Sequence, residues 1–449
     1  MGYFDNCRPD QRFTIRHKFF DNCVVNDWDQ RRVVTVHTAW AEQDEDFIFD
    51  ALARHIDTIP ADNVLVEVSR EGDLLSCSSD VEDDRTMIPF YPATREFPPE
   101  LQRINRSDLT EVDRLGIQAD LATYDTQSCP GQVKHVAFKY YLNEPQVAIF
   151  WHEINCVLRI PKHPNIVPFD SLVVDTIDGE DRVVGFTTPF IDGGTVEDNT
   201  DRAFKLKYLK QLLDVIDYLN LKLGIVHGDI CPWNLLINPD TDNLQIFDFN
   251  MAAKLGWEGD TSDEGQGAFA FDENRNDVKC AVFTLYEVIT RDLRFREEYY
   301  PHELDVSMVL GLDDWEKHPD VRLDANVAEY RQLLQSWLEE RRETDKHIVH
   351  FSQLPDALDW PPLPEFPAVH KVDDYVERRP AHMRQEMIMR GADFLRWQRP
   401  ASKELPLPWG RRLLATGEVV EDETAVEHDI EDDGDVPGDE DVLAQEEDE

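Results

Sequence analysis

The segment GIVHGDICPWNLLI occupies residues 224–237, and the triplet DFN follows at residues 248–250. Asp229 precedes Asn234 by five residues, and the apolar runs NLLI and LQIF then flank NPDTDN, whose turn-forming residues predict a hairpin. Such a hairpin would return the chain so that Asp248 lies near Asp229 and Asn234. Three oxygen-bearing side chains at this spacing could hold a metal ion and a hydroxyl group, or they could be ordinary turn residues.

The chain has 449 residues, which is enough for a large two-lobed domain with additions or for two or three ordinary domains. Its net charge is −47 and is unevenly spread, because residues 418–449 contain 17 acidic residues and no Lys or Arg. We predict that this tail is disordered, since it cannot bury enough apolar surface to fold. The rest of the chain keeps a net charge of about −30, and the overall apolar content of 41% suffices for hydrophobic cores.

The composition excludes several classes of protein. The sequence has no basic stripe, which argues against a nucleic-acid partner. Its seven cysteines are scattered without a CxxC pair, which argues against a disulfide framework or zinc site and for a reducing compartment. The N-terminal residues lack the apolar core of a signal peptide, Asn6 stands where myristoylation needs Ser or Thr, and no apolar run approaches the roughly 18 residues of a membrane span. We therefore expect an intracellular, cytoplasmic protein with no membrane partner, and the nucleus is the alternative compartment.

Secondary-structure patterns around the opening motif have a definite order. In VKHVAFKYY (133–141) the alternation of a strand places Ala137 and Lys139 on one face. Apolar residues at helical spacing in VAIFWHEINCVLRI (147–160) predict a helix that contains Glu153. The other predicted elements are a strand ending at a Gly-Gly turn (182–194), an amphipathic helix (206–224), a helix that is apolar almost all round (277–290), a further helix (382–398) and two short strands near the N-terminus (33–40 and 63–68).

This order of elements and motifs is similar to that of the eukaryotic protein kinase domain. Between about residues 109 and 345 the family's signals follow in sequence: a strand with a lysine, a helix with a glutamate, a hinge, a long helix, H-x-D-x4-N, D-F-x and a buried helix. The sequence resembles a divergent, fungal branch of that superfamily. The resemblance implies an α+β, bilobal fold with a β-rich N-lobe (about 109–190) and a helical C-lobe (about 191–345). We expect an N-terminal extension of uncertain fold (1–108), a Pro-rich C-terminal extension (346–417) and the acidic tail (418–449) around it.

The resemblance implies a nucleotide site with ATP as the ligand. VAFK is similar to the family's V-A-I-K, which implies that Lys139 contacts the α- and β-phosphates and is held by an ion pair with Glu153. Gly116 in LGIQADLATY matches the first glycine of the phosphate loop. TTPFIDGG is similar to the family's hinge, and the residues carried over as adenine contacts are Ala137, Thr188, Pro189, Phe190, Ile191 and Leu236.

The opening motif then corresponds to the catalytic apparatus. HGDICPWN is similar to H-R-D-x-x-x-x-N, which implies that Asp229 accepts or orients the proton of the acceptor hydroxyl and that Asn234 holds Mg²⁺. DFN is similar to D-F-G, which makes Asp248 the main metal carboxylate, and Mg²⁺ prefers such hard oxygen ligands. Asp277 resembles the buried aspartate that braces the catalytic loop. The resemblance therefore implies ATP–Mg²⁺-dependent phosphoryl transfer to Ser or Thr hydroxyls of a protein substrate.

Several positions depart from the family's pattern. Gln118 and Leu121 replace the second and third glycines of the phosphate loop. Gly228 replaces the arginine of H-R-D, and Cys231 replaces the lysine that follows the catalytic aspartate. Asn250 replaces the last glycine of D-F-G and tolerates left-handed backbone angles, and no A-P-E motif occurs in GAFAFDENRND. Two alternatives therefore stay open: a pseudokinase that serves as a scaffold for a protein partner with weak nucleotide binding, and a small-molecule kinase similar to the aminoglycoside and choline kinases, which share HGD.

Overall fold

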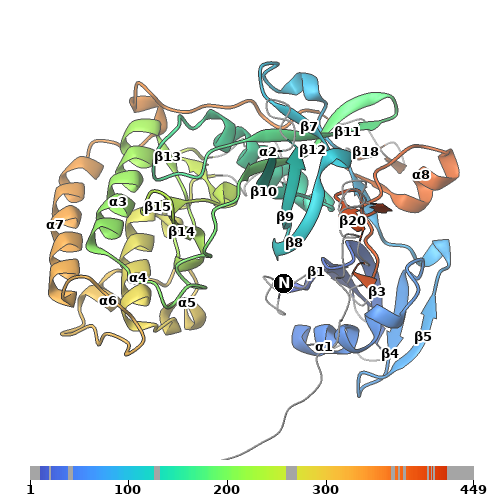
Figure 1. The fold of residues 1–449 in the computed structure, drawn as a ribbon, viewed down its shortest axis with the longest axis horizontal. Coiled ribbons are helices and arrows are strands. Elements are labelled where there is room, and N and C mark those ends of the chain that lie inside the picture. Colours follow the sequence, from blue (N-terminus) through green and yellow to red (C-terminus); the bar gives the residue numbers. More distant parts are fainter. Residues whose placement is uncertain are drawn as a thin grey trace, which may run out of the picture.

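The computed structural model contains three regions that lie side by side (Figure 1). The N-terminal residues form a small sheet with one helix, a larger sheet forms the centre, and a helical region lies on the far side of it. From residue 422 onward, the predicted acidic tail lies outside the described residues. The structure describes residues 11–19, 22–38, 44–125, 132–258, 270–365, 370–372, 375–377, 381–401, 404–405, 407 and 410–421.

The N-terminal sheet has the strand order β1-β2-β3-β4-β5, in which β3 and β4 run parallel and the other neighbours are antiparallel. Two of its strands, β3 and β4, lie where the sequence predicts strands. Helix α1 covers one face, because Ile48 and Leu52 pack in one buried cluster with Val25 and Val66. The elements are β1 (Phe13–Phe19), β2 (Asn22–Asp27), β3 (Arg32–Thr38), α1 (Glu45–His55), β4 (Leu65–Val68) and β5 (Leu74–Ser78).

The N-lobe is an eight-stranded sheet with the order β21-β20-β8-β9-β10-β12-β11-β7, so C-terminal strands lie beside β8. Helix α2 packs on this sheet, since Phe150 and Trp151 are buried in the same cluster as Phe138 and Phe186. Strand β21 contains the first residues of the segment predicted as tail. The elements are β7 (Arg103–Asn105), β8 (Thr110–Gly116), β9 (Ala119–Asp125), β10 (Val133–Tyr140), α2 (Glu144–Arg159), β11 (Ser171–Ile177), β12 (Glu180–Pro189), β20 (Arg411–Leu414) and β21 (Val419–Glu421).

The C-lobe is built around two helices predicted from the sequence. The apolar stripe of α3 is buried, and α3 continues as a wider helical turn that ends at Gly224 in the left-handed conformation (φ 68°). Helix α4 is buried on nearly all sides, as its composition predicts. The elements are α3 (Leu206–Asp217), β13 (Ile225–Val226), β14 (Leu235–Asn238), β15 (Asn243–Ile246), β16 (Ala253–Lys254), α4 (Asp277–Thr290), α5 (Arg294–Glu298), α6 (Ser307–Leu310) and α7 (Val327–Asp345).

The C-terminal extension returns to the N-lobe. Helix α8 is shorter than the helix predicted for 382–398, because Gly391 is left-handed (φ 65°) and ends it. From residue 392 to residue 400 the chain has no regular secondary structure, and it buries Leu395 and Trp397 in the core of the N-lobe. The remaining elements are β6 (Met87–Pro89), β17 (His370–Val372), β18 (Tyr375–Glu377), β19 (Ala381–Met383) and α8 (Arg384–Arg390).

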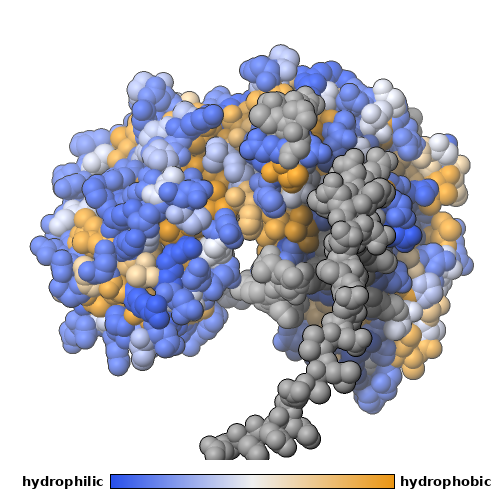
Figure 2. Space-filling model, in the orientation of Figure 1, coloured by the Kyte–Doolittle hydropathy of each residue, from blue (hydrophilic) through white to orange (hydrophobic). Residues whose placement is uncertain are grey.

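The visible surface of the molecule is largely hydrophilic (Figure 2). The C-lobe presents a mostly hydrophilic face in Figure 2, with small scattered apolar areas. Among the described residues, no helix has both the length and the apolar composition that crossing a membrane requires.

The Pro-rich segment packs against helix α2. Trp151 Nε1 donates to the carbonyl oxygen of Pro361 at 2.9 Å, and Trp360 Nε1 donates to Nδ1 of His152, also at 2.9 Å. Burial and the nearby charge of Lys254 lower the pKa of His152 to about 4, so the ring stays neutral and keeps Nδ1 as an acceptor. The segment therefore holds α2 through two indole hydrogen bonds.

The protein should lose stability in mild acid because of His152. The pKa of this histidine is about 4 in the folded state against an ordinary 6.5, so between these values the unfolded chain binds the proton and the folded chain does not. The free energy of unfolding is unaffected by His152 above pH 6.5 and falls by about 3 kcal/mol as the pH drops to 4. Denaturant titrations at several pH values should show that the free energy of unfolding depends less on pH in His152→Gln than in wild type. The glutamine amide oxygen still accepts the hydrogen bond from Trp360. Equal pH dependence in the two proteins would contradict this assignment.

Candidate active site

Lys139 lies between two carboxylates that come from distant parts of the chain. Burial along β10 alternates, so that Val136 and Phe138 enter the core and Lys139 faces the other way. Lys139 Nζ is 2.5 Å from Glu153 Oε1 on α2 and 2.5 Å from Asp248 Oδ1, which follows β15. The sequence analysis paired the lysine with the glutamate alone, and the structure adds the aspartate.

The three charged groups determine one another's protonation. Burial would lower the pKa of Lys139, but Asp248 and Glu153 outweigh it and raise that pKa above its ordinary value. Burial would raise the pKa of Asp248, but the Lys139 charge outweighs it and lowers that pKa. At Glu153 burial prevails and raises the pKa to about 7. The side chain of Asp248 stays 26% exposed against 4% for Glu153, so Asp248 is the carboxylate that a ligand can reach.

The backbone at Asp248 is left-handed, with φ 66° and ψ 73°. Phe249 is buried against the ring of His227, with 4.7 Å between ring centroids. His227 Nε2 lies 2.9 Å from the carbonyl oxygen of Phe247, on the other side of Asp248. These contacts hold Asp248 in a conformation that residues other than glycine rarely adopt. The sequence predicts tolerance of that conformation at Asn250, whereas the structure adopts it at Asp248.

Asp229 and Asn234 are joined directly. Asn234 Nδ2 donates to the backbone oxygen and to Oδ2 of Asp229, both at 2.9 Å. Because the amide nitrogen is engaged, Asn234 presents its Oδ1 oxygen to other groups. The hairpin predicted around NPDTDN is present as the β14–β15 pair, and it returns the chain so that Phe247 N donates to the carbonyl oxygen of Asn234 at 3.4 Å. The short spacing thus joins Asp229 to Asn234 directly, and the hairpin returns the chain to Asn234 one residue before Asp248.

Asp277 braces the backbone before Asp229. Its fully buried carboxylate accepts hydrogen bonds from His227 N at 2.8 Å and Gly228 N at 2.9 Å. Gly228 has φ 78°, and a Cβ there would lie 2.4 Å from the carbonyl oxygen of Met251. The arginine that the family has at this position does not fit this backbone, which explains the glycine of HGD.

Cys231 fills the position of the absent lysine. It is buried, and its Sγ lies 3.3 Å from the carbonyl oxygen of Asp229. Burial raises the pKa of the thiol, so Cys231 is neutral and adds no charge to the site.

Arg296 is a neighbour of the catalytic loop that the sequence analysis missed. Its Nη2 donates to the carbonyl oxygen of Ile230 at 3.0 Å, and its Nε lies 2.6 Å from Glu287. The hydroxyl of Thr284 also donates to the Ile230 oxygen at 3.0 Å. Ile230 directly follows Asp229, so these contacts hold the loop in place. The signal in the sequence was the pair of polar residues, Thr284 and Glu287, in the middle of a mostly apolar helix.

The segment matched to the phosphate loop is a tight hairpin. A two-residue turn links Gly116 at the end of β8 to Ala119 at the start of β9. Gln118 in this turn is left-handed (φ 61°), the conformation that glycine adopts most readily. Leu121, aligned with the third glycine, is a buried residue within β9. A Cβ at Gly116 would lie 3.1 Å from the side-chain oxygen of Gln11, so the N-terminal segment approaches the hairpin closely.

The residues predicted to surround the adenine come from both lobes. Ala137 on β10 pairs with Thr188 on β12, and Phe190 N donates to the carbonyl oxygen of His135 at 3.2 Å. Leu236 comes from β14 of the C-lobe. All six predicted positions are partly exposed, as residues lining a cleft are: Ala137, Thr188, Pro189, Phe190, Ile191 and Leu236.

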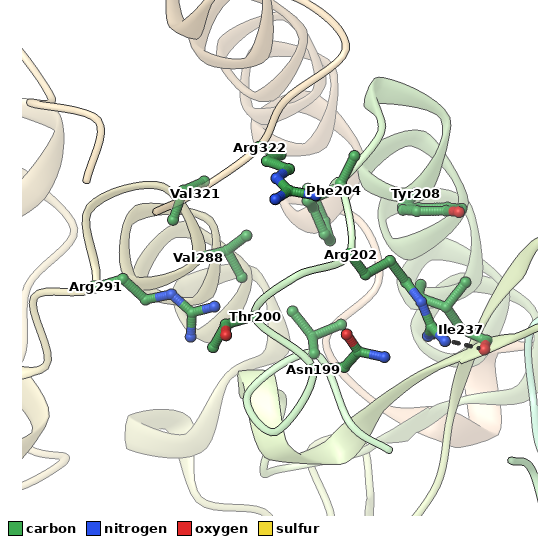
Figure 3. Close-up of a pocket in the computed structure, with 12 residues that line it drawn as sticks. Asn199, Thr200, Arg202, Phe204, Tyr208, Ile237, Val288, Arg291, Val321 and Arg322 are labelled. Carbon is green, nitrogen blue, oxygen red and sulfur yellow. Dashed lines mark hydrogen bonds between the residues drawn. The ribbon is translucent and has the colours of Figure 1, made fainter. Parts of the chain in front are cut away.

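A separate depression lies on the C-lobe (Figure 3). Arg202 donates to the carbonyl oxygen of Ile237 at 3.1 Å on one side of it, and Arg291 and Arg322 lie on other sides. None of the residues predicted for the site is among those that line it. The candidate site is therefore defined by the cluster around Lys139.

Comparison with known proteins agrees with this geometry. Residues 127–271 match the protein kinase domain family. Residues 127–271 thus form a protein kinase-like domain. A 120-residue stretch is 29% identical to serine/threonine-protein kinase nekl-2 of Caenorhabditis elegans and covers 23% of this chain and 31% of that protein. Another, of 116 residues, is 31% identical to a putative serine/threonine-protein kinase of Acanthamoeba polyphaga mimivirus and covers 25% of this chain and 20% of that protein.

The kinase-domain match confirms the family and the α+β fold predicted from the sequence. The fungal branch stays a prediction. The matched stretches span less than a third of either relative's length, and the family match leaves the N-terminal sheet and the C-terminal extension outside it.

Substitution of Gly228 in the kinase domain tests its steric constraint. Gly228→Ala and Gly391→Ala both put a side chain on a left-handed glycine, but only the first meets a backbone oxygen, since no described atom lies within 4 Å of a Cβ at Gly391. We expect Gly228→Ala to lower the free energy of unfolding by about 3 kcal/mol and Gly391→Ala by about 1 kcal/mol. Denaturant unfolding measures both. Equal losses would show that the Met251 oxygen imposes no constraint.

Proposed function

We propose that the protein catalyses ATP–Mg²⁺-dependent phosphoryl transfer to serine or threonine hydroxyls of a protein substrate. The observation that carries the proposal is Lys139 Nζ at 2.5 Å from both Glu153 and Asp248. Phosphoryl transfer is accelerated mainly by positioning and by neutralising negative charge, and a fixed ammonium beside a reachable carboxylate suits both tasks. The names of both relatives, which are serine/threonine-protein kinases, favour a protein hydroxyl as the acceptor.

In this proposal the nucleotide lies in the cleft between the lobes. Lys139 binds the α- and β-phosphates, and Glu153 keeps the lysine in place. The adenine is enclosed by Ala137 of the N-lobe and Leu236 of the C-lobe and meets the hinge backbone after Thr188. The partial exposure of these lining residues supports the assignment. Gly116 contributes the closest backbone approach to the phosphates.

We assign the magnesium ion to Asn234 and Asp248. The donor set fits, because Asp248 stays ionised and Asn234 directs its carbonyl oxygen away from Asp229. In the described part of the chain, no group of three or more His, Cys, Asp or Glu could hold a metal ion. This suits Mg²⁺, which takes one or two protein ligands and completes its shell with phosphate oxygens and water. When bound, Mg²⁺ neutralises charge on the phosphates.

In this proposal Asp229 orients the acceptor hydroxyl. Its carboxylate is held by Asn234 Nδ2 at 2.9 Å and remains partly exposed. A hydroxyl that approaches Asp229 can donate its hydrogen bond to the carboxylate, which orients the oxygen for attack and accepts the proton. Asp277 and Arg296 keep the backbone around Asp229 in place.

Two further functions are supported by single observations. A scaffold role without catalysis is favoured by the neutral, buried Cys231 and by Gln118 in the hairpin turn, because each removes a feature that helps to hold phosphates. A small-molecule acceptor is favoured by Gly228, whose backbone excludes an arginine, since the aminoglycoside and choline kinases share HGD. The transfer assay below distinguishes all three.

Asp248→Asn and Asp229→Asn should have different effects. Asp248→Asn removes a metal carboxylate, so Mg²⁺-dependent ATP affinity and turnover should both fall. Asp229→Asn leaves the metal ligands in place and removes the group that orients the acceptor. ATP affinity should then persist while turnover drops about 10²–10⁴-fold. ATP binding with and without Mg²⁺, followed by γ-phosphate transfer to mixed protein and small-molecule acceptors, measures both quantities.

Asp240→Asn, in the exposed turn of the β14–β15 hairpin, is the matched control and should leave both quantities unchanged. Transfer that survives Asp229→Asn undiminished would refute the role of that residue. A folded wild-type protein that binds ATP and transfers phosphate to no acceptor, itself included, would favour the scaffold role. Transfer to small molecules alone would favour the second alternative.

A further inference from the structure

A fully buried cluster of four charged side chains joins the N-terminal sheet to strands β8 and β9. Arg31 pairs with Glu111 of β8 and with Asp120 of β9, the latter at 2.6 Å. Arg399 of the C-terminal extension pairs with the same two carboxylates, at 2.7 Å from Glu111. None of the four side chains is exposed, and their formal charges cancel. Buried charges are costly unless each is paired, so the cluster requires all of its members.

Arg31 reaches the cluster from the tight turn between β2 and β3. The turn is closed by Asp27, whose Oδ1 accepts from Asp29 N at 3.0 Å. Arg31 itself is left-handed (φ 48°), a conformation that a non-glycine residue adopts only when its surroundings hold it there. Its guanidinium lies over the ring of Tyr140, 4.6 Å from the centroid, and Tyr140 directly follows Lys139.

A second contact ties the same turn to the tip of the hairpin. Arg114 of β8 is fully buried and pairs with Asp29 of the turn. Its Nη2 also donates to the carbonyl oxygen of Gly116 at 2.9 Å. Gly116 is the last residue before the hairpin turn, so the ionic contacts reach the tip itself.

The hairpin is coupled to the lysine through the sheet. Ala119 pairs with Lys139, and Asp120 pairs with Phe138, across β9 and β10. A displacement of β9 therefore changes the distance between the hairpin tip and the Lys139 ammonium. A glycine-rich loop can adapt its backbone to phosphates after they bind, whereas Gln118 and Leu121 restrict that adjustment here.

We propose that Arg31 and Arg399 are positioning residues that fix the β8–β9 hairpin at the height above Lys139 that phosphate binding requires. The inference rests on the proposed nucleotide site. In this arrangement the N-terminal sheet and the C-terminal extension form part of the nucleotide-binding lobe, and rigid ionic anchoring takes the place of the missing loop glycines. The ligand is a nucleoside polyphosphate. Binding of its phosphates depends on the two arginines, whereas binding of its base does not.

Arg106 provides a matched control. It is also a buried arginine of the N-lobe, it pairs with Asp175 at 2.8 Å, and it lies over Trp397 and donates to the carbonyl oxygen of Arg396. It thus ties the same C-terminal extension to the lobe and shares Trp397 and the Ala415 carbonyl oxygen with Arg31, but its carboxylate partner is Asp175 of β11 instead of Glu111 or Asp120. A merely structural role of Arg31 or Arg399 would make their variants behave like Arg106→Lys.

The test uses the full-length chain with Arg31→Lys, Arg399→Lys and Arg106→Lys, because lysine keeps the charge and loses the planar fork that contacts two carboxylates. We expect ATP affinity to fall about tenfold in the first two variants, since misplacing a binding group by a fraction of an ångström has effects of this size. Adenosine affinity should stay within about twofold of wild type in all three. Hydrogen exchange of residues 111–121, measured without nucleotide, should quicken in Arg31→Lys and Arg399→Lys only.

Unchanged ATP affinity with unchanged exchange of the hairpin in folded Arg31→Lys and Arg399→Lys would overturn the proposal, as would equal losses of ATP and adenosine affinity. If a lysine variant does not fold, Glu111→Gln with Arg399→Gln keeps the cluster neutral and should give the same pattern. A wild-type protein that binds neither ATP nor adenosine would refute the proposed function, and hairpin exchange would still decide whether the arginines brace the hairpin.

Discussion

The ammonium group of Lys139 is the point on which the rest of the structure depends. Removing a lysine from water is costly, and the cost is offset only where carboxylates lie within contact distance. Glu153 requires α2 to pack on the N-lobe sheet, and Asp248 requires the β14–β15 hairpin to return the chain to the cleft. The three charges thus fix the position of one lobe relative to the other. This position imposes the strained, left-handed backbone at Asp248.

The two carboxylates differ in burial and therefore in role. Glu153 is almost completely enclosed, and its contact with the ammonium group holds the lysine. Asp248 is ionised and partly exposed, so it is the group that can serve a ligand. The loop of residues 227–234 beside them is held in another way, because Asp277 and Arg296 bind its backbone. Rigid backbone and reachable oxygens together suit a reaction that relies on positioning.

The extensions are part of the lobe they surround. A domain boundary at residue 109, as the kinase resemblance implies, separates Arg31 from the carboxylates of Glu111 and Asp120. A boundary before Arg399 does the same at the other end of the chain. Cutting at either place leaves buried charges without partners, which is far more costly than removing a neutral surface element. We therefore predict that the kinase-like domain of this chain folds only together with its flanking segments.

The sequence by itself determined the kinase resemblance, the alternation of β10, the buried helix α4 and the hairpin between Asn234 and Asp248. These rest on patterns within a few residues, or on spacings that one hairpin closes. Only the tertiary structure decided the second carboxylate on Lys139, the steric need for Gly228, the role of Arg296 and the cluster around Asp120. The partners of Asp120 lie 89 and 279 residues away in the chain. A buried charge pairs with whichever opposite charge the fold brings close to it, and no local sequence pattern predicts that partner.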